Sequence, residues 1–175
     1  SGDLVVDNSG GIVAGSGLNS YYNGSNYYTY YFGTQVATGI NATSNGEGAA
    51  VSVSNSGDIT ADGIFGATGI AATASGYGGS ASVTNSGAIY ASQNQKYGYG
   101  AYGIVVSSDG DGSIDNSGSI EVYSGGVANG ATVLSFAGDA SVTNSGDISV
   151  YSAAALYYAA TGITAFAANG SASVD

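Results

Sequence analysis

The chain has no cysteine, histidine, proline, methionine or tryptophan, and Lys96 is its only basic residue. Without cysteine and histidine, most transition-metal sites and the common nucleophile–base pairs are excluded. The 12 acidic residues give a formal net charge of −11. This charge disfavours nucleic acid and anionic membrane surfaces, because both are bound through lysine and arginine. No run of 18 apolar residues occurs, so we expect no membrane insertion in this segment.

Charged residues are scarce, at 7% of the chain, whereas hydrophobic residues make up 43%. This composition is too apolar for an acidic disordered segment. The lack of proline suits strands that donate backbone hydrogen bonds within a sheet. The abundant residues are glycine and tyrosine, with 31 and 15 copies.

One tripeptide recurs along the chain. Asn-Ser-Gly begins at Asn8, Asn55, Asn85, Asn116 and Asn144, at intervals of 47 (8 to 55), 30 (55 to 85), 31 (85 to 116) and 28 (116 to 144). An isoleucine follows two positions after each glycine. Two other pieces recur in fixed order, a Gly-Ile run such as "ATGIAATA" and an alternating run such as "SASVTN". A period of about 30 residues is typical of a solenoid.

All three pieces alternate between apolar and polar residues, which indicates short strands with one buried face. Glycine-containing junctions between them provide corners. The sequence therefore predicts an all-β fold, a right-handed parallel β-helix of about five three-stranded coils, spanning residues 1–175 as a single domain.

Like residues of successive coils are expected to stack in three interior columns. Asparagine amides are expected to form a hydrogen-bonded ladder at one corner, with the glycine two places later relieving the turn. Asn-Ser-Gly is thus interpreted as a structural corner. The columns are Ile59, Ile89, Ile120 and Ile148; Ile40, Ile70, Ile104 and Ile163, with Val133 near Ile104; and Val53, Val83, Ile114, Val142 and Val174.

Insertions in a solenoid collect at corners and commonly carry binding surfaces. Residues 16–35 form a Tyr-rich corner insertion, and most other tyrosines fall at the same junction of later coils. Two interpretations stay open: the rings shield the corner, or they form a contact surface. The candidate contact residues are Tyr21, Tyr22, Tyr27, Tyr28, Tyr30, Tyr31, Phe32, Tyr97, Tyr99, Tyr102, Tyr157 and Tyr158.

Asp109, Asp111 and Asp115 stand at close spacing in a Gly-rich segment, which makes them a weak calcium candidate. The segment lacks a twelve-residue loop closed by glutamate, and an acidic, solvated corner is the simpler interpretation. The remaining carboxylates are scattered over different coils and form no obvious catalytic pair. We therefore predict that the chain has no catalytic residues and no cofactor and is not an enzyme.

The repeated "ATGI" and "ASVTNSGDI" pieces resemble the passenger regions of autotransporter-type bacterial surface proteins. The resemblance implies a parallel β-helix that is secreted or exposed on the bacterial cell surface, often as an adhesin or fibre component. We expect the chain to be either a segment of a longer solenoid or a subunit that stacks head to tail.

The expected function is therefore a non-enzymatic extracellular scaffold that presents a Tyr-rich edge for adhesion or fibre formation. Its partners would be further copies of itself, by head-to-tail or lateral association, or a host or cell-surface glycan or protein. The alternative is a glycan-binding or glycan-cleaving β-helix of the phage tailspike type. An ice-binding solenoid is a third reading, because Thr38, Thr68 and Thr161 recur before Gly-Ile, but Tyr102 and Ala131 interrupt that column.

Overall fold

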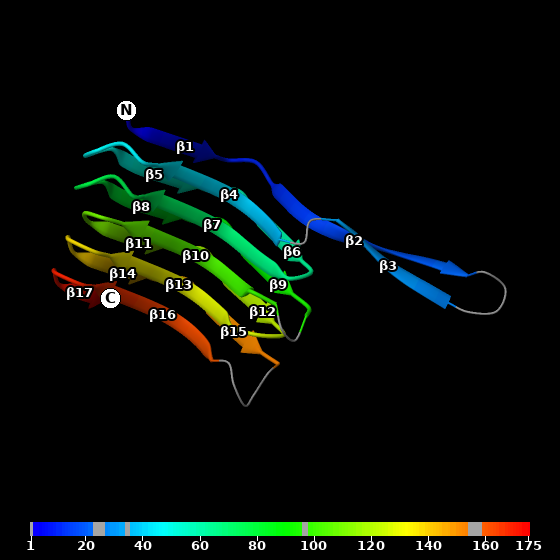
Figure 1. The fold of residues 1–175 in the computed structure, drawn as a ribbon. Coiled ribbons are helices and arrows are strands. Elements are labelled where there is room, and N and C mark those ends of the chain that lie inside the picture. Colours follow the sequence, from blue (N-terminus) through cyan, green and yellow to red (C-terminus); the bar gives the residue numbers. More distant parts are fainter. Residues whose placement is uncertain (1, 23–26, 34–35, 96–97, 154–158) are drawn as a thin grey trace.

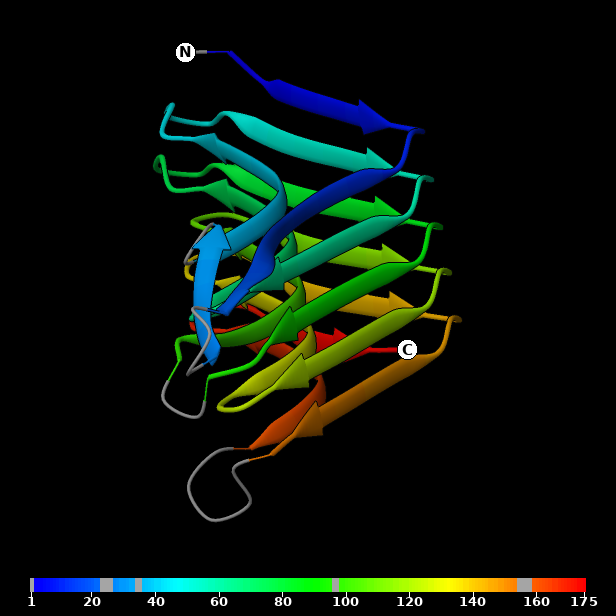
Figure 2. The same ribbon diagram turned by 90° about the vertical axis from the view of Figure 1, so that its right-hand side faces the viewer.

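The computed structural model describes residues 2–22, 27–33, 36–95, 98–153 and 159–175, with the backbone alone described for residues 16–22 and 27–33. The chain winds through three sheets in a repeating order and forms a β-solenoid (Figures 1 and 2). Each strand pairs in parallel with its counterpart in the next coil, apart from β3. The predicted all-β parallel β-helix with three-stranded coils is confirmed.

The three sheets are named here by their order along a coil. The first sheet contains β1 (Leu4–Asn8), β5 (Ala50–Asn55), β8 (Ser80–Asn85), β11 (Gly112–Asn116), β14 (Ala140–Asn144) and β17 (Ala172–Val174). The second contains β2 (Ile12–Tyr22), β3 (Tyr27–Gly33), β6 (Ile59–Gly63), β9 (Ile89–Gln93), β12 (Ile120–Ser124) and β15 (Ile148–Ser152). The third contains β4 (Val36–Ser44), β7 (Gly66–Ala74), β10 (Gly100–Ser108), β13 (Ala128–Ser135) and β16 (Ala160–Ala167).

The interior is built from columns of identical or similar apolar residues. Ile59, Ile89, Ile120 and Ile148 are register partners in the second sheet, as predicted. The valine and isoleucine column from Val53 to Val174 is likewise continuous in the first sheet. Each fully buried Val or Ile side chain of these columns contributes about 1.5–3 kcal/mol to folding. The columns therefore serve as the hydrophobic core of the solenoid.

The prediction for the third sheet was right for the column of isoleucines and wrong for Val133, which was expected near Ile104. Ile40, Ile70 and Ile104 are register partners. The residue opposite Ile104 is Ala131, whereas Val133 pairs with Val106. A Cβ on Gly130 would lie 2.5 Å from the carbonyl oxygen of Gly162, so only glycine fits at this position of the stack. This requirement places Gly130 next to the glycines of the neighbouring Gly-Ile runs and so sets the register of β13. Backbone alignment, not side-chain size, therefore determines which residue enters the column.

The corner between the first and second sheets, the asparagine corner, carries the predicted amide ladder. Each of the first four asparagines donates through Nδ2 to the Oδ1 of the asparagine in the next coil, over 2.7–2.8 Å. Each also donates to the carbonyl of the glycine two residues later, over 2.7–2.9 Å. Asn55, Asn85 and Asn116 are buried, so these bonds satisfy groups that water does not reach. The ladder contains Asn8, Asn55, Asn85, Asn116 and Asn144.

The role predicted for the glycine of this tripeptide was wrong. Among the described residues, positive φ occurs only at Gly48, Gly78 and Gly100, so the asparagine corner needs no left-handed backbone. The glycine is required by close approach instead. A Cβ on Gly87 would lie 2.1 Å from the carbonyl oxygen of Gly57, and one on Gly118 would lie equally close to that of Gly87. The backbones of stacked coils are too close at these glycine positions to leave room for a side chain.

A second interlocking feature joins the second and third sheets across the interior. The Cγ2 atoms of Ile59, Ile89 and Ile120 occupy the space that a Cβ would need on the glycine of the Gly-Ile run, 2.4 Å away in each case. Each glycine thus accommodates the isoleucine of the second-sheet strand in the next coil. The glycines that pack in this way are Gly39, Gly69 and Gly103.

The predicted corner insertion is an extension of the second sheet. β2 continues beyond its pairing with β6 and folds back through β3 as an antiparallel hairpin, with Ser16 opposite Gly33 and Tyr22 opposite Tyr27. This hairpin, here called the arm, projects away from the stack of coils (Figure 1). The two ends of the chain lie at opposite ends of the stack (Figures 1 and 2).

Candidate contact surface

Three tyrosines lie next to one another on the outer face of the second sheet. Tyr90 is on β9, Tyr123 on β12 and Tyr151 on β15. The ring centroids of Tyr90 and Tyr123 are 6.1 Å apart, and those of Tyr123 and Tyr151 are 5.8 Å apart, with the rings tilted by 43° and 46°. Their residues are 37%, 40% and 58% exposed. We call this row the tyrosine ladder.

Strand alternation explains why these rings face outward. Their neighbours Ile89, Val122 and Val150 point into the solenoid, so residues one position away point out. Tyr123 and Tyr151 are direct register partners. Tyr90 is paired with Glu121, so its ring reaches Tyr123 diagonally. The core is complete without these rings, and they leave much of their surface in contact with solvent.

Glu121 lies within the ladder. It stands opposite Tyr90 in the register and two residues before Tyr123 on the same face. The Glu121 carboxylate raises the pKa of Tyr123 above its usual 10.0, through side-chain hydrogen bonding first and through its negative charge second. The ladder therefore combines three rings with an exposed carboxylate.

A shallow depression of ≈ 150 Å³ adjoins the ladder where the second sheet ends. Tyr123 and Tyr151 form its aromatic side, and Gln93, Asn94 and Ser124 contribute polar groups. Gln93 is buried, donates from Nε2 to the carbonyl oxygens of Ile64 and Gln95, and accepts a bond from the Ser124 hydroxyl. These bonds hold the floor of the depression in place.

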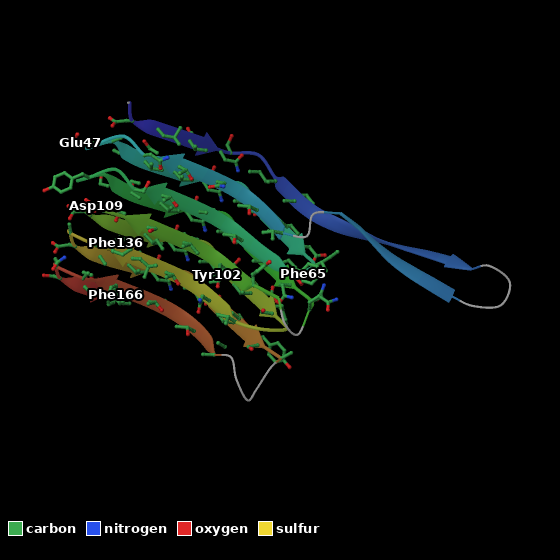
Figure 3. All side chains as sticks on the ribbon, viewed as in Figure 1. Glu47, Phe65, Tyr102, Asp109, Phe136 and Phe166 are labelled. Atoms are coloured by element: carbon green, nitrogen blue, oxygen red, sulfur yellow. The ribbon has the colours of Figure 1, made fainter. Side chains whose placement is uncertain are left out.

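Of the predicted contact residues, the structure describes the side chains of Tyr99 and Tyr102. Tyr99 is 77% exposed, and the Tyr102 hydroxyl donates to the Tyr99 carbonyl oxygen over 3.2 Å. Tyr99 directly precedes β10 and its amide donates to the Phe65 carbonyl oxygen, and Tyr102 is the third residue of β10 (Figure 3). The arm contains Tyr21, Tyr22, Tyr27, Tyr28, Tyr30, Tyr31 and Phe32, whose backbone pairing alone is described. Tyr97, Tyr157 and Tyr158 lie outside the described residues.

Sequence reasoning missed the ladder itself, because it assigned Tyr90, Tyr123 and Tyr151 to a junction between strands. They are strand residues on one exposed face. The signal that reveals them is their position, one or three residues after the isoleucine of the repeat, where alternation points side chains outward. The ladder and the arm belong to the same sheet.

The calcium candidates are not gathered into one site. Asp109 accepts the backbone amide of Gly78 over 2.7 Å, and Asp111 accepts that of Asp139 over 2.9 Å. Asp115 is exposed on the outer face of β11. Within the part of the chain that the structure describes, no group of three His, Cys, Asp or Glu residues is placed to hold a metal ion. Asp109 and Asp111 instead connect neighbouring coils at the corner between the third and first sheets.

The column considered for ice binding has a different composition from the one expected. Its register runs through Thr38, Thr68, Tyr102, Asn129 and Thr161. Asn129, not Ala131, is therefore the second interruption, and Ala131 belongs to the interior column described above. The threonine column is broken in its middle coils.

Comparison of the chain with protein-family models, with curated proteins and with solved structures finds no match. Among the residues that the structure describes, no helix is long and apolar enough to cross a lipid bilayer. The architecture and the exposed surface are therefore the basis for a functional proposal.

Proposed function

We propose that this chain is a non-enzymatic, extracellular β-helix of the bacterial cell surface that serves adhesion or fibre formation. In this proposal the second sheet, with its tyrosine ladder and arm, is the contact surface. The resemblance of the repeats to autotransporter passenger regions supports the location and the class. The observation that carries the proposal is the row of exposed tyrosines on neighbouring coils of one sheet.

The physical support is that these rings are not needed for the core. Tyrosine rings give a large contact area at a small entropic cost, so an exposed row of them suits a binding surface. The arm adds seven further aromatic residues to the same sheet. Interior columns and backbone ladders hold the solenoid together, so the outer face is free to vary in sequence and to contact a partner.

Adhesion of beads coated with the full chain tests the proposal. We expect binding to cultured epithelial cells, or clumping of the beads with each other if the function is fibre formation. The variant Tyr90→Ser, Tyr123→Ser, Tyr151→Ser should lose most of this adhesion. The control is Phe136→Ser, Phe166→Ser, which removes two half-exposed rings, one directly after β13 and one near the end of β16, both away from the second sheet (Figure 3). Equal adhesion by both variants would reject the ladder as the contact surface.

A glycan-binding or glycan-cleaving β-helix is the second candidate. It is favoured by Asp62 and Glu121, whose carboxylates are on the same side of the second sheet as the ladder. Aromatic rings stack on sugars, and a carboxylate pair is the usual machinery of glycoside hydrolysis. Release of reducing ends from a panel of bacterial polysaccharides, abolished by Asp62→Asn or Glu121→Gln, would establish this function in place of the first.

A further inference from the structure

The outer faces of the sheets differ in charge. The five strands of the third sheet contain no charged residue. The second sheet carries Asp62 and Glu121 within its strands, and Asp58 and Asp147 directly before β6 and β15. The only basic residue, Lys96, lies outside the described residues. The face that bears the exposed tyrosines therefore also bears negative charge.

Glu121 is the carboxylate closest to the rings in the register. It is exposed, it faces Tyr90 across the strand pair, and it lies two residues before Tyr123 on the same face. A carboxylate offers about four lone-pair sites, so this exposed group has acceptor capacity for a ligand. The adjacent rings are tilted and half-exposed, so parts of their faces are open to a ligand. A cation held at Glu121 would thus lie beside aromatic rings.

We infer that the tyrosine ladder and Glu121 bind arginine side chains of a cationic protein partner. A guanidinium group suits this arrangement because it is planar, pairs with a carboxylate through two parallel bonds and stacks on aromatic faces. A cation within about 6 Å of a tyrosine ring centroid is attracted by the ring. Three rings along neighbouring coils fit several arginines of one extended segment.

The negative charge of the chain favours a basic polypeptide over the other classes of ligand. A net charge of −11 repels nucleic acids and anionic glycans, and attracts a basic polypeptide. A neutral glycan would stack on the rings and could donate hydroxyls to Glu121, but it would bring no positive charge to neutralise this carboxylate. The inference rests on the proposed function, since it names the partner of the same contact surface.

The probe is an eight-residue peptide of alternating arginine and glycine, measured by calorimetry with the full chain. Two matched probes replace arginine by lysine or by citrulline. Citrulline keeps the shape of arginine and removes its charge. We expect the arginine peptide to bind about tenfold more tightly than the citrulline peptide, and more tightly than the lysine peptide. Equal binding of the arginine and citrulline peptides would overturn the inference.

Two single-charge variants separate the site from general attraction to an acidic protein. Glu121→Gln should weaken binding of the arginine peptide about fivefold to tenfold. Asp115→Asn, on the exposed face of the first sheet, removes the same charge and should weaken it by less than about twofold. Circular dichroism checks that both variants are folded. Equal losses in the two variants would show non-specific electrostatic binding and reject the site.

The bead assay distinguishes failure of this inference from failure of the proposed function. If the triple serine variant loses adhesion while the wild-type chain ignores the arginine peptide, the contact surface stands and the partner is not cationic. If adhesion survives in the triple variant, the ladder is rejected as the contact surface and the arginine assignment falls with it; if the wild-type beads neither bind cells nor clump, the proposed function fails. Tight binding of a neutral glycan, unaffected by Glu121→Gln, would assign the ladder to carbohydrate and also overturn the arginine assignment.

Discussion

The asparagine corner and the corner between the second and third sheets face different constraints. The asparagine corner repeats the same three residues in every coil and is held by an unbroken amide ladder. The second corner, which we call the variable corner, has two residues between β6 and β7, but six between β9 and β10 (94–99) and three between β12 and β13 (125–127). In the first coil it carries the whole arm.

The difference shows where a solenoid tolerates change. At the asparagine corner, each coil supplies a donor and an acceptor to its neighbours, and glycine backbones are in direct contact. A change in one coil therefore disturbs the coils above and below. At the variable corner Gln93 also bonds to neighbouring coils, through the Ile64 carbonyl oxygen and the Ser124 hydroxyl, but no single side chain repeats there from coil to coil. Extra residues leave the stack there without breaking a continuous ladder.

The largest effect is expected from adding a methyl group at the asparagine corner. Gly87→Ala would place a Cβ 2.1 Å from the Gly57 carbonyl oxygen, so two coils would have to separate. We expect a loss of about 3 kcal/mol or more in the free energy of unfolding, measured by chemical denaturation. Gly10→Ala is the control, since its Cβ would meet nothing within 4 Å. A similar loss in both variants would show that close approach is not the reason for glycine.

The next effect compares buried amides at the two corners. Asn85→Ala interrupts the ladder and leaves the Asn55 donor, the Asn116 acceptor and the Gly87 carbonyl without their partner. We expect a loss of about 2–4 kcal/mol in the free energy of unfolding, because the desolvation cost of buried groups is no longer offset when they are left unpaired. Gln93→Ala, beside the depression that solvent reaches, should cost about half as much. Equal losses in thermal or chemical unfolding would contradict the distinction between the corners.

A smaller effect is expected from removing the arm. Replacing residues 16–35 by residues 63–65, the last residue of β6 and the two residues that join it to β7, leaves the pairing of Ile12 to Gly15 with β6 intact. The free energy of unfolding should change by no more than about 1 kcal/mol, since surface loops are tolerated at low cost. Circular dichroism should retain the β signal. Unfolding of the shortened chain would show that the arm is part of the folding core.

The smallest effect concerns the titration of Tyr123. Glu121→Gln should lower the pKa of Tyr123 towards 10.0, because the hydrogen bond to a carboxylate and its charge favour the neutral phenol. In the wild-type chain this interaction is fully present below the unfolded pKa and is lost as pH rises through the higher folded value. NMR titration of the tyrosine ring carbons measures both chains. An unchanged pKa would show that the two side chains do not interact in solution.

Much of the fold was predictable because the repeat fixes alternation, and alternation fixes which residues point inward. The isoleucine column of the second sheet and the asparagine ladder follow from this directly. The placement of Val133 failed because Gly130, not residue size, aligns β13. The turn geometry assigned to the Asn-Ser-Gly glycine failed because the distance between coils cannot be read from one coil.

The candidate surface was harder to predict. The sequence indicated clustered tyrosines near one corner, but Tyr90 and Tyr123 occupy different positions after their isoleucines, so no sequence alignment pairs them. They meet diagonally across the sheet, and Glu121 enters the cluster only through its register with Tyr90. The continuation of β2 into an antiparallel arm depends on pairing with β3, which the spacing of tyrosines did not indicate.

The sequence by itself determined the solenoid, its three strands per coil and its inward-facing columns, because periodicity of two and a repeat near 30 residues act through local backbone geometry. The tertiary structure decided which side chains of neighbouring coils touch, where glycine is obligatory and how the tyrosines align with Glu121. These features depend on register and on the separation of stacked backbones, which exist only once one coil lies on the next.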